Sequence, residues 1–134
     1  MWLFTRYGFY SIACAHRPDG SLDAENVMVR ARQVAHLKNL QKRFPVVASA
    51  EIFTWPDRDY RYRLIIAKAV WVEIVAELAQ EQEWSNFKSE AARNQGAGSD
   101  YVHALHQIWG VMSRLQSETR SAEEPTPRKK RTDA

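Results

Sequence analysis

Cysteine and long apolar runs are both scarce in this chain. Its 134 residues include one cysteine, Cys14, which excludes an intramolecular disulfide and a zinc site built from several thiolates. No apolar run reaches the roughly 18 residues that a membrane-spanning helix needs. Residues 1–6 lack the basic start and the small-residue cleavage site of a signal peptide. These absences predict a cytoplasmic protein without a membrane partner.

The sequence also lacks the common motifs of enzymes and cofactor-binding proteins. It has no phosphate-binding loop, no glycine fingerprint for dinucleotides, no nucleophile elbow and no thiol pair. The common enzyme mechanisms are therefore disfavoured, and no cofactor or metal is predicted. Enzymes that use none of these motifs stay open.

Positive charge is in slight excess. The formal net charge is +3 and the isoelectric point is near 9.2. Residues 117–134 hold five basic and four acidic residues, which leaves 14 basic and 12 acidic residues at positions 1–116. Because the main part of the chain is nearly neutral, any argument for nucleic-acid binding must rest on local groups of basic residues.

The hydrophobic pattern changes period twice, each time from that of a strand to that of a helix. Residues 60–67 alternate as in a strand, and helical spacing follows from Trp71 to Leu78. Upstream, residues 27–32 alternate in the same way, and helical spacing follows as far as Phe44. The pattern predicts two units, each a β-hairpin followed by a helix.

Two further strands complete the predicted sheet, at residues 2–15 and 46–55. Gly8 within the first suggests a bulge or a close backbone approach. The predicted fold class is α+β, with a four-stranded antiparallel sheet and helices on one face. Its order, ββαββα, is a circular permutation of the ferredoxin-like plait. An alternative is one long helix over residues 23–43, whose apolar face would be interrupted at Arg30.

A helical extension and a tail follow the second unit. Helices are predicted over residues 86–94 and, with Ser99 as N-cap, from there to Gln116. Residues 117–134 contain no apolar residue larger than alanine and are predicted to be a disordered charged tail. The single domain would then be residues 1–116. A sheet that is apolar on both faces favours a homodimer.

Three segments resemble a known family: M-W-L-F-T-R-Y-G-F-Y-S at the start, N-F-K-S-E-A-A-R-N-Q-G at 86–96 and Y-V-H-A-L-H-Q-I-W-G-V-M-S-R-L-Q at 101–116. Together they look like a family of small uncharacterised bacterial proteins. The resemblance covers most of residues 1–116 and omits the tail. It implies a bacterial cytoplasmic origin and assigns no catalytic or binding residue.

The sheet face without helices is the first candidate site. Tyrosines beside arginines on such a face can stack unpaired bases while guanidinium groups hold the phosphates. Along residues 60–68, Tyr60, Tyr62 and Lys68 share one side and Arg61 and Arg63 the other, so either side exposes a basic or aromatic group. A structural role, in the core or in a sheet-to-sheet dimer, is the competing interpretation. The predicted nucleic-acid-binding residues are Arg30, Arg32, Tyr60, Arg61, Tyr62, Arg63, Lys68 and Lys88, with Arg128, Lys129, Lys130 and Arg131 of the tail.

A second candidate is the pattern D-x-x-H-x-x-H on the last predicted helix. His103 and His106 lie three residues apart and can share a face, and Asp100 is one turn earlier. Two metal ligands, or an acid and a base, would need such an arrangement. Ordinary histidines on a helix surface give the same pattern.

The basic and aromatic residues favour a small accessory protein that binds nucleic acid, in the first place single-stranded. The alternative is a protein–protein interaction module that uses the sheet and the last helix without nucleic acid. A histidine-dependent enzyme or metal protein is the third hypothesis.

Overall fold

The computed structural model describes residues 1–123, with side chains described as far as Glu118. The elements of this part, in chain order, are β1 (Trp2–Thr5), β2 (Gly8–His16), β3 (Leu22–Ala31), α1 (Val34–Arg43), a 3-10 turn (Pro45–Val47), β4 (Phe53–Thr54), β5 (Tyr62–Ala67), α2 (Lys68–Gln80), α3 (Phe87–Gln95) and α4 (Asp100–Glu123).

The strands of residues 1–123 form one antiparallel sheet of five, in the order β1-β2-β3-β5-β4. The α+β class and the antiparallel sheet are confirmed, but the predicted number of strands is wrong, because residues 2–15 form a hairpin. The chain turns at Arg6 and Tyr7, where the Thr5 hydroxyl accepts hydrogen bonds from the N–H groups of Tyr7 and Gly8 at 3.1 and 3.2 Å. Neither Arg6 nor Tyr7 is a typical turn former, and both lie within a run of aromatic residues, so the sequence gives no signal for this turn.

Residues 46–55, predicted as a strand, form mostly a turn. Only Phe53–Thr54 pairs with β5. Gln41 on α1 donates to the carbonyls of Val47 and Ala50 at 3.1 and 2.8 Å, so these acceptors are satisfied without a neighbouring strand. With an added first strand and a very short fourth one, the permuted ferredoxin-like order is not confirmed.

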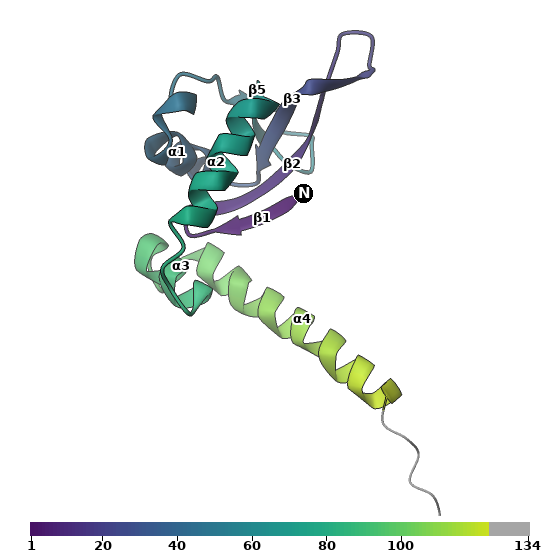
Figure 1. The fold of residues 1–134 in the computed structure, drawn as a ribbon, viewed down its shortest axis with the longest axis vertical. Coiled ribbons are helices and arrows are strands. Elements are labelled where there is room, and N and C mark those ends of the chain that lie inside the picture. Colours follow the sequence, from purple (N-terminus) through teal and green to yellow (C-terminus); the bar gives the residue numbers. More distant parts are fainter. Residues whose placement is uncertain (124–134) are drawn as a thin grey trace, which may run out of the picture.

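Helices α1 and α2 cover one face of the sheet (Figure 1). Alternate residues of β3 and β5, such as Val29 and Leu64, belong to the same buried cluster as Leu37 of α1 and Ile74 of α2. The strand interpretation of residues 27–32 is therefore confirmed, and the long helix over 23–43 is wrong. Each of the two hairpins β2–β3 and β4–β5 precedes a helix, as the changes of period predict.

The turn between β1 and β2 is buried under α1 and α4, two helices that are far apart in the sequence. Gly8 has a φ of +152°, and a Cβ at this position would lie 2.4 Å from Cγ of His36 on α1. The close approach suggested by the glycine is therefore present. Tyr101 at the start of α4 donates to the carbonyl of Thr5 at 2.7 Å, and Asn39 of α1 donates to that of Tyr7 at 3.0 Å. These contacts fix α1 and α4 at the turn end of the sheet.

Helix α4 starts where the sequence predicts and ends later. The Ser99 hydroxyl accepts a hydrogen bond from the N–H of Val102 at 3.2 Å, as an N-cap does. The helix continues through residues 117–123, which the sequence analysis places in the tail, because a helix that is already started extends at low cost. The tail residues Arg128, Lys129, Lys130 and Arg131 lie outside the described residues. Across residues 1–123, no helix combines the length and apolar character needed to cross a membrane.

Candidate functional site

The face of the sheet opposite α1 and α2 carries a group of arginines and aromatic rings. Arg30 on β3 lies directly opposite Arg63 on β5, so the two side chains share this face. The loop between β4 and β5 adds Trp55, Arg58 and Tyr60, which line one groove together with Arg30 and Arg63. We call these five residues the arginine face. Like charges directly opposite on neighbouring strands repel each other, so this arrangement costs stability.

Each arginine of this face lies against an aromatic ring. The guanidinium carbon of Arg63 is 4.0 Å from the centre of the Trp55 ring, and that of Arg58 is 5.9 Å from it. Arg30 lies 4.8 Å from the centre of the Tyr60 ring, and Arg32, just after β3, lies 4.2 Å from the same ring. All are within the ~6 Å over which a cation is attracted to a ring face.

Arg63 is the most buried of these cations, with 5% of its surface exposed. Its Nη2 donates to the carbonyl of Tyr60 at 2.8 Å, whereas its Nε has no hydrogen-bond partner. Burial lowers the pKa of Arg63, and the positive charges of Arg30 and Arg58 lower it further. A bound anion would relieve both effects, because it offsets the desolvated charge and the repulsion.

The described side chains supply no such anion. Within residues 1–118, no carboxylate forms an ion pair with Arg30, Arg58 or Arg63. Arg30 instead donates to the hydroxyl of Ser11 at 2.8 Å. Close by, Arg32 and Asp59 form an ion pair at 3.2 Å between exposed groups. The face is therefore strongly basic although residues 1–116 taken together are nearly neutral.

A groove of about 640 Å³ lies over the arginine face. Beside the five residues already named, its walls include His16, Met28 and Ile65, with Asp59 as an acidic residue. Trp55 is 44% exposed. The groove thus combines exposed ring surface, apolar side chains and uncompensated positive charge, which suits a ligand with both planar rings and anionic groups.

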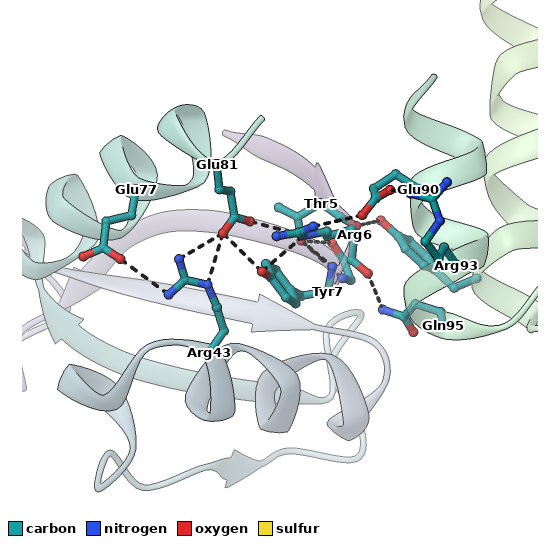
Figure 2. A network of polar contacts seen from close by, with 11 residues as sticks. Thr5, Arg6, Tyr7, Arg43, Glu77, Glu81, Glu90, Arg93 and Gln95 are labelled. Carbon is teal, nitrogen blue, oxygen red and sulfur yellow. Dashed lines mark hydrogen bonds and ion pairs between the residues drawn. The ribbon is translucent and has the colours of Figure 1, made fainter. Parts of the chain in front are cut away.

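The arginines at the turn end of the sheet have a different environment (Figure 2). Arg6 donates to Glu90 at 2.9 Å and lies 3.4 Å from Glu81, and Arg43 reaches the same Glu81 at 3.0 Å. Burial lowers the pKa of Arg6, but hydrogen bonds to Glu90 and Tyr7 outweigh it, and the pKa is raised. Since these charges are compensated within the chain, they explain structure rather than ligand binding. We call the following residues the paired cluster: Arg6, Arg43, Glu77, Glu81, Glu90 and Arg93.

Comparisons with protein-family models, with curated proteins and with solved structures found no match. The resemblance to a family of small bacterial proteins therefore stays an expectation from the sequence. Function has to be argued from the geometry of the arginine face.

The structure brings together part of the predicted nucleic-acid-binding set. Arg61 is exposed and lies outside the groove, and Tyr62 is half-buried against the core on the other face of the sheet. Lys68 is exposed at the start of α2, and Lys88 on α3 lies 4.6 Å from the centre of the Trp109 ring. The predicted residues that gather at the arginine face are Arg30, Arg32, Tyr60 and Arg63.

Trp55 and Arg58 are site residues that the sequence analysis missed. Strand alternation does not identify them, because they lie in the loop between β4 and β5 and not in a strand. One signal was present, since an aromatic and a basic residue occur in a short loop next to the basic strand. A hairpin loop stays beside its own strands, so its side chains were candidates for the same face.

The histidine pattern predicted on the last helix lies at the start of α4. Asp100, His103 and His106 are all exposed, and the described residues contain no group of three or more side chains that could hold a metal ion. His36 is instead the buried histidine, whose Nδ1 accepts a hydrogen bond from the N–H of Phe9 at 3.3 Å. Burial lowers the pKa of His36, which favours the neutral ring that packs against Gly8.

Proposed function

We propose that the arginine face binds single-stranded nucleic acid. The observation that carries this proposal is Arg63, a buried cation without a carboxylate partner within residues 1–118, with two further arginines beside it. Phosphate groups form charge-assisted hydrogen bonds with guanidinium groups and are frequently bound in a bidentate way. A phosphate in the groove would offset the repulsion that the protein itself leaves uncompensated.

The aromatic residues support a ligand with unpaired bases. Trp55 has a cation against its ring and is still 44% exposed, so it offers surface on which a base can stack. Bases that are already paired in a duplex offer no such face, whereas single strands stack readily on aromatic side chains and guanidinium planes. The combination of stacking and phosphate binding favours a single strand over a simple anion.

The test is binding of a labelled random single-stranded RNA or DNA to the full chain across a salt series. The variant combines Arg30→Gln with Arg58→Gln, and the control combines Arg61→Gln with Lys68→Gln. Both remove two positive charges, but only the first pair lines the groove. We expect the groove variant to bind at least about ten-fold more weakly at low salt, with a log–log salt slope that is shallower by about 1.4.

The control variant is expected to change affinity by less than about three-fold, because screening limits the effect of charges outside the site. Equal weakening in the two variants would show non-specific attraction only. Absence of salt-dependent binding by the unmodified protein would reject the proposed function. Melting temperatures of both variants show whether folding is preserved.

A further inference from the structure

Helix α4 has an apolar stripe that the arginine face does not explain. Its first turns are buried, with Val102 and Leu105 in one cluster with Tyr101 and Ala91. Beyond them the apolar side chains are exposed: Ile108 is 37% exposed, and Trp109, Val111, Met112 and Leu115 are each more than half exposed. Figure 1 shows this half of α4 extending away from the sheet and the other helices. An apolar stripe of this size is unusual on a surface that stays in contact with water.

The spacing of the stripe is that of a helix–helix seam. Leu105, Ile108, Met112 and Leu115 follow one another at intervals of three, four and three residues. This is the a and d spacing with which two helices pack side chains into each other's holes. A single helix in water gains nothing from this pattern, because most helical stability in proteins comes from packing an apolar face.

A groove runs along the stripe on the same chain, and the stripe itself forms one of its walls. It has a volume of about 440 Å³, and its apolar walls come from Phe4, Phe87, Leu105, Ile108, Trp109 and Met112. One chain therefore presents both an apolar ridge and an apolar groove at the same place. A two-fold axis brings the ridge of each copy to the groove of the other, which is the requirement of an isologous interface.

The charges of α4 permit two copies to run antiparallel. From Tyr101 to Ser113 the helix contains no Asp, Glu, Lys or Arg, and Arg114 is the one residue of these four types between Leu105 and Leu115. With the axis at the level of Gly110, Ile108 of one copy lies opposite Met112 of the other, and Leu105 lies opposite Leu115.

We propose that the protein forms a homodimer through antiparallel packing of α4 against α4 of a second copy. This surface is distinct from the sheet-to-sheet contact predicted from the sequence, whose premise of two apolar faces is wrong, because the second face of the sheet carries Arg30 and Arg63. The proposal does not depend on nucleic-acid binding, and either can fail alone.

The test is the molar mass of the full chain in solution, measured by light scattering over a concentration range. The variant combines Trp109→Glu with Met112→Glu, and the control is Val72→Glu on α2, a position that is also exposed in one chain. We expect the unmodified protein and the control to have twice the chain mass of 15.5 kDa, and the α4 variant to have that mass once. A monomeric unmodified protein at high micromolar concentration, or a dimeric α4 variant, would overturn the proposal.

Disulfide cross-linking tests the antiparallel arrangement in a Cys14→Ser background. Val111→Cys places two thiols near the two-fold axis, so it should cross-link under mild oxidation. Leu115→Cys places them about ten residues apart along the axis, or ~15 Å, which is too far for a disulfide. Efficient cross-linking of Leu115→Cys, or none of Val111→Cys, would contradict the antiparallel packing.

Discussion

Two groups of arginines within residues 1–118 have different surroundings. In the paired cluster at the turn end of the sheet, Arg6 and Arg43 share the carboxylate of Glu81, and Arg6 also binds Glu90 (Figure 2). On the arginine face, Arg30 and Arg63 contact rings, a hydroxyl and a carbonyl. The same side chain thus serves two purposes: it joins helices where its charge is compensated, and it can receive a ligand where it is not.

The two regions differ in their electrostatic contribution to the stability of the fold. Buried charges are tolerated when they are paired and hydrogen-bonded, which describes the paired cluster. Arg63 is more buried than Arg6 and Arg43 and has no carboxylate partner among residues 1–118, so the folded chain carries an unfavourable electrostatic contribution there. Proteins commonly keep such local costs at sites that bind a partner. Three changes test this comparison, from the largest expected effect to the smallest.

Removing the shared carboxylate should destabilise the paired cluster most. Glu81 is only 13% exposed, accepts a hydrogen bond from Tyr7 at 3.2 Å and contacts two arginines. Glu81→Gln leaves both guanidinium groups without their common negative charge, and we expect the free energy of unfolding to fall by about 2 kcal/mol. Urea denaturation monitored by circular dichroism measures this.

Glu77→Gln is the matched control, since Glu77 contacts only Arg43, at 3.5 Å, and is 55% exposed. An exposed ion pair of this kind contributes about 0.5 kcal/mol or less. If the two variants lost equal stability, the charges of the cluster would not act through burial and sharing.

Removing a cation from the arginine face should affect stability much less. Arg63→Met loses the hydrogen bond to Tyr60 and the contact with Trp55, but it also removes a desolvated charge and its repulsion with Arg30. Because these contributions oppose each other, we expect the free energy of unfolding to change by less than about 1 kcal/mol. Affinity for single-stranded nucleic acid should fall in the same variant.

The same denaturation experiment, run beside Glu81→Gln, decides the point. A loss for Arg63→Met as large as that for Glu81→Gln would show that Arg63 is mainly structural. The contrast between the two regions would then disappear.

The sequence predicts those parts of the arginine face that depend on the hydrophobic period within one segment. Alternation along residues 27–32 and 60–67 identifies the strands that carry Arg30 and Arg63, because side chains of a strand change face at every residue. The turn at Arg6 and Tyr7 could not be found this way. It is held by groups distant in sequence, such as Tyr101, which lies 96 residues after Thr5.

Charge pairing is equally hidden from the sequence. Arg6 and Glu90 are 84 residues apart, so nothing local separates Arg6, which is paired, from Arg63, which has no carboxylate partner among residues 1–118. The contribution of Trp55 depends on how its loop folds over the sheet. Composition therefore shows that arginines are present, and only the tertiary structure shows which of them lack a carboxylate.

The smallest effect is expected when Arg32, which lies beside the arginine face, loses its carboxylate partner. Arg32 lies over Tyr60 and pairs with Asp59 at 3.2 Å, and both charged groups are exposed. Asp59→Asn removes an acidic residue of the groove and leaves Arg32 at its ring. We expect stability to change by about 0.5 kcal/mol or less, because exposed ion pairs contribute little. Affinity for a single strand should instead rise about two- to five-fold at low salt, with a salt slope steeper by about 0.7, since one more guanidinium group can meet a phosphate.

Asp57→Asn, in the same loop but not lining the groove, is the matched control and should change affinity less. Weaker binding by Asp59→Asn would mean that Asp59 positions Arg32 for the ligand, and that pairing and binding are not alternatives at this residue.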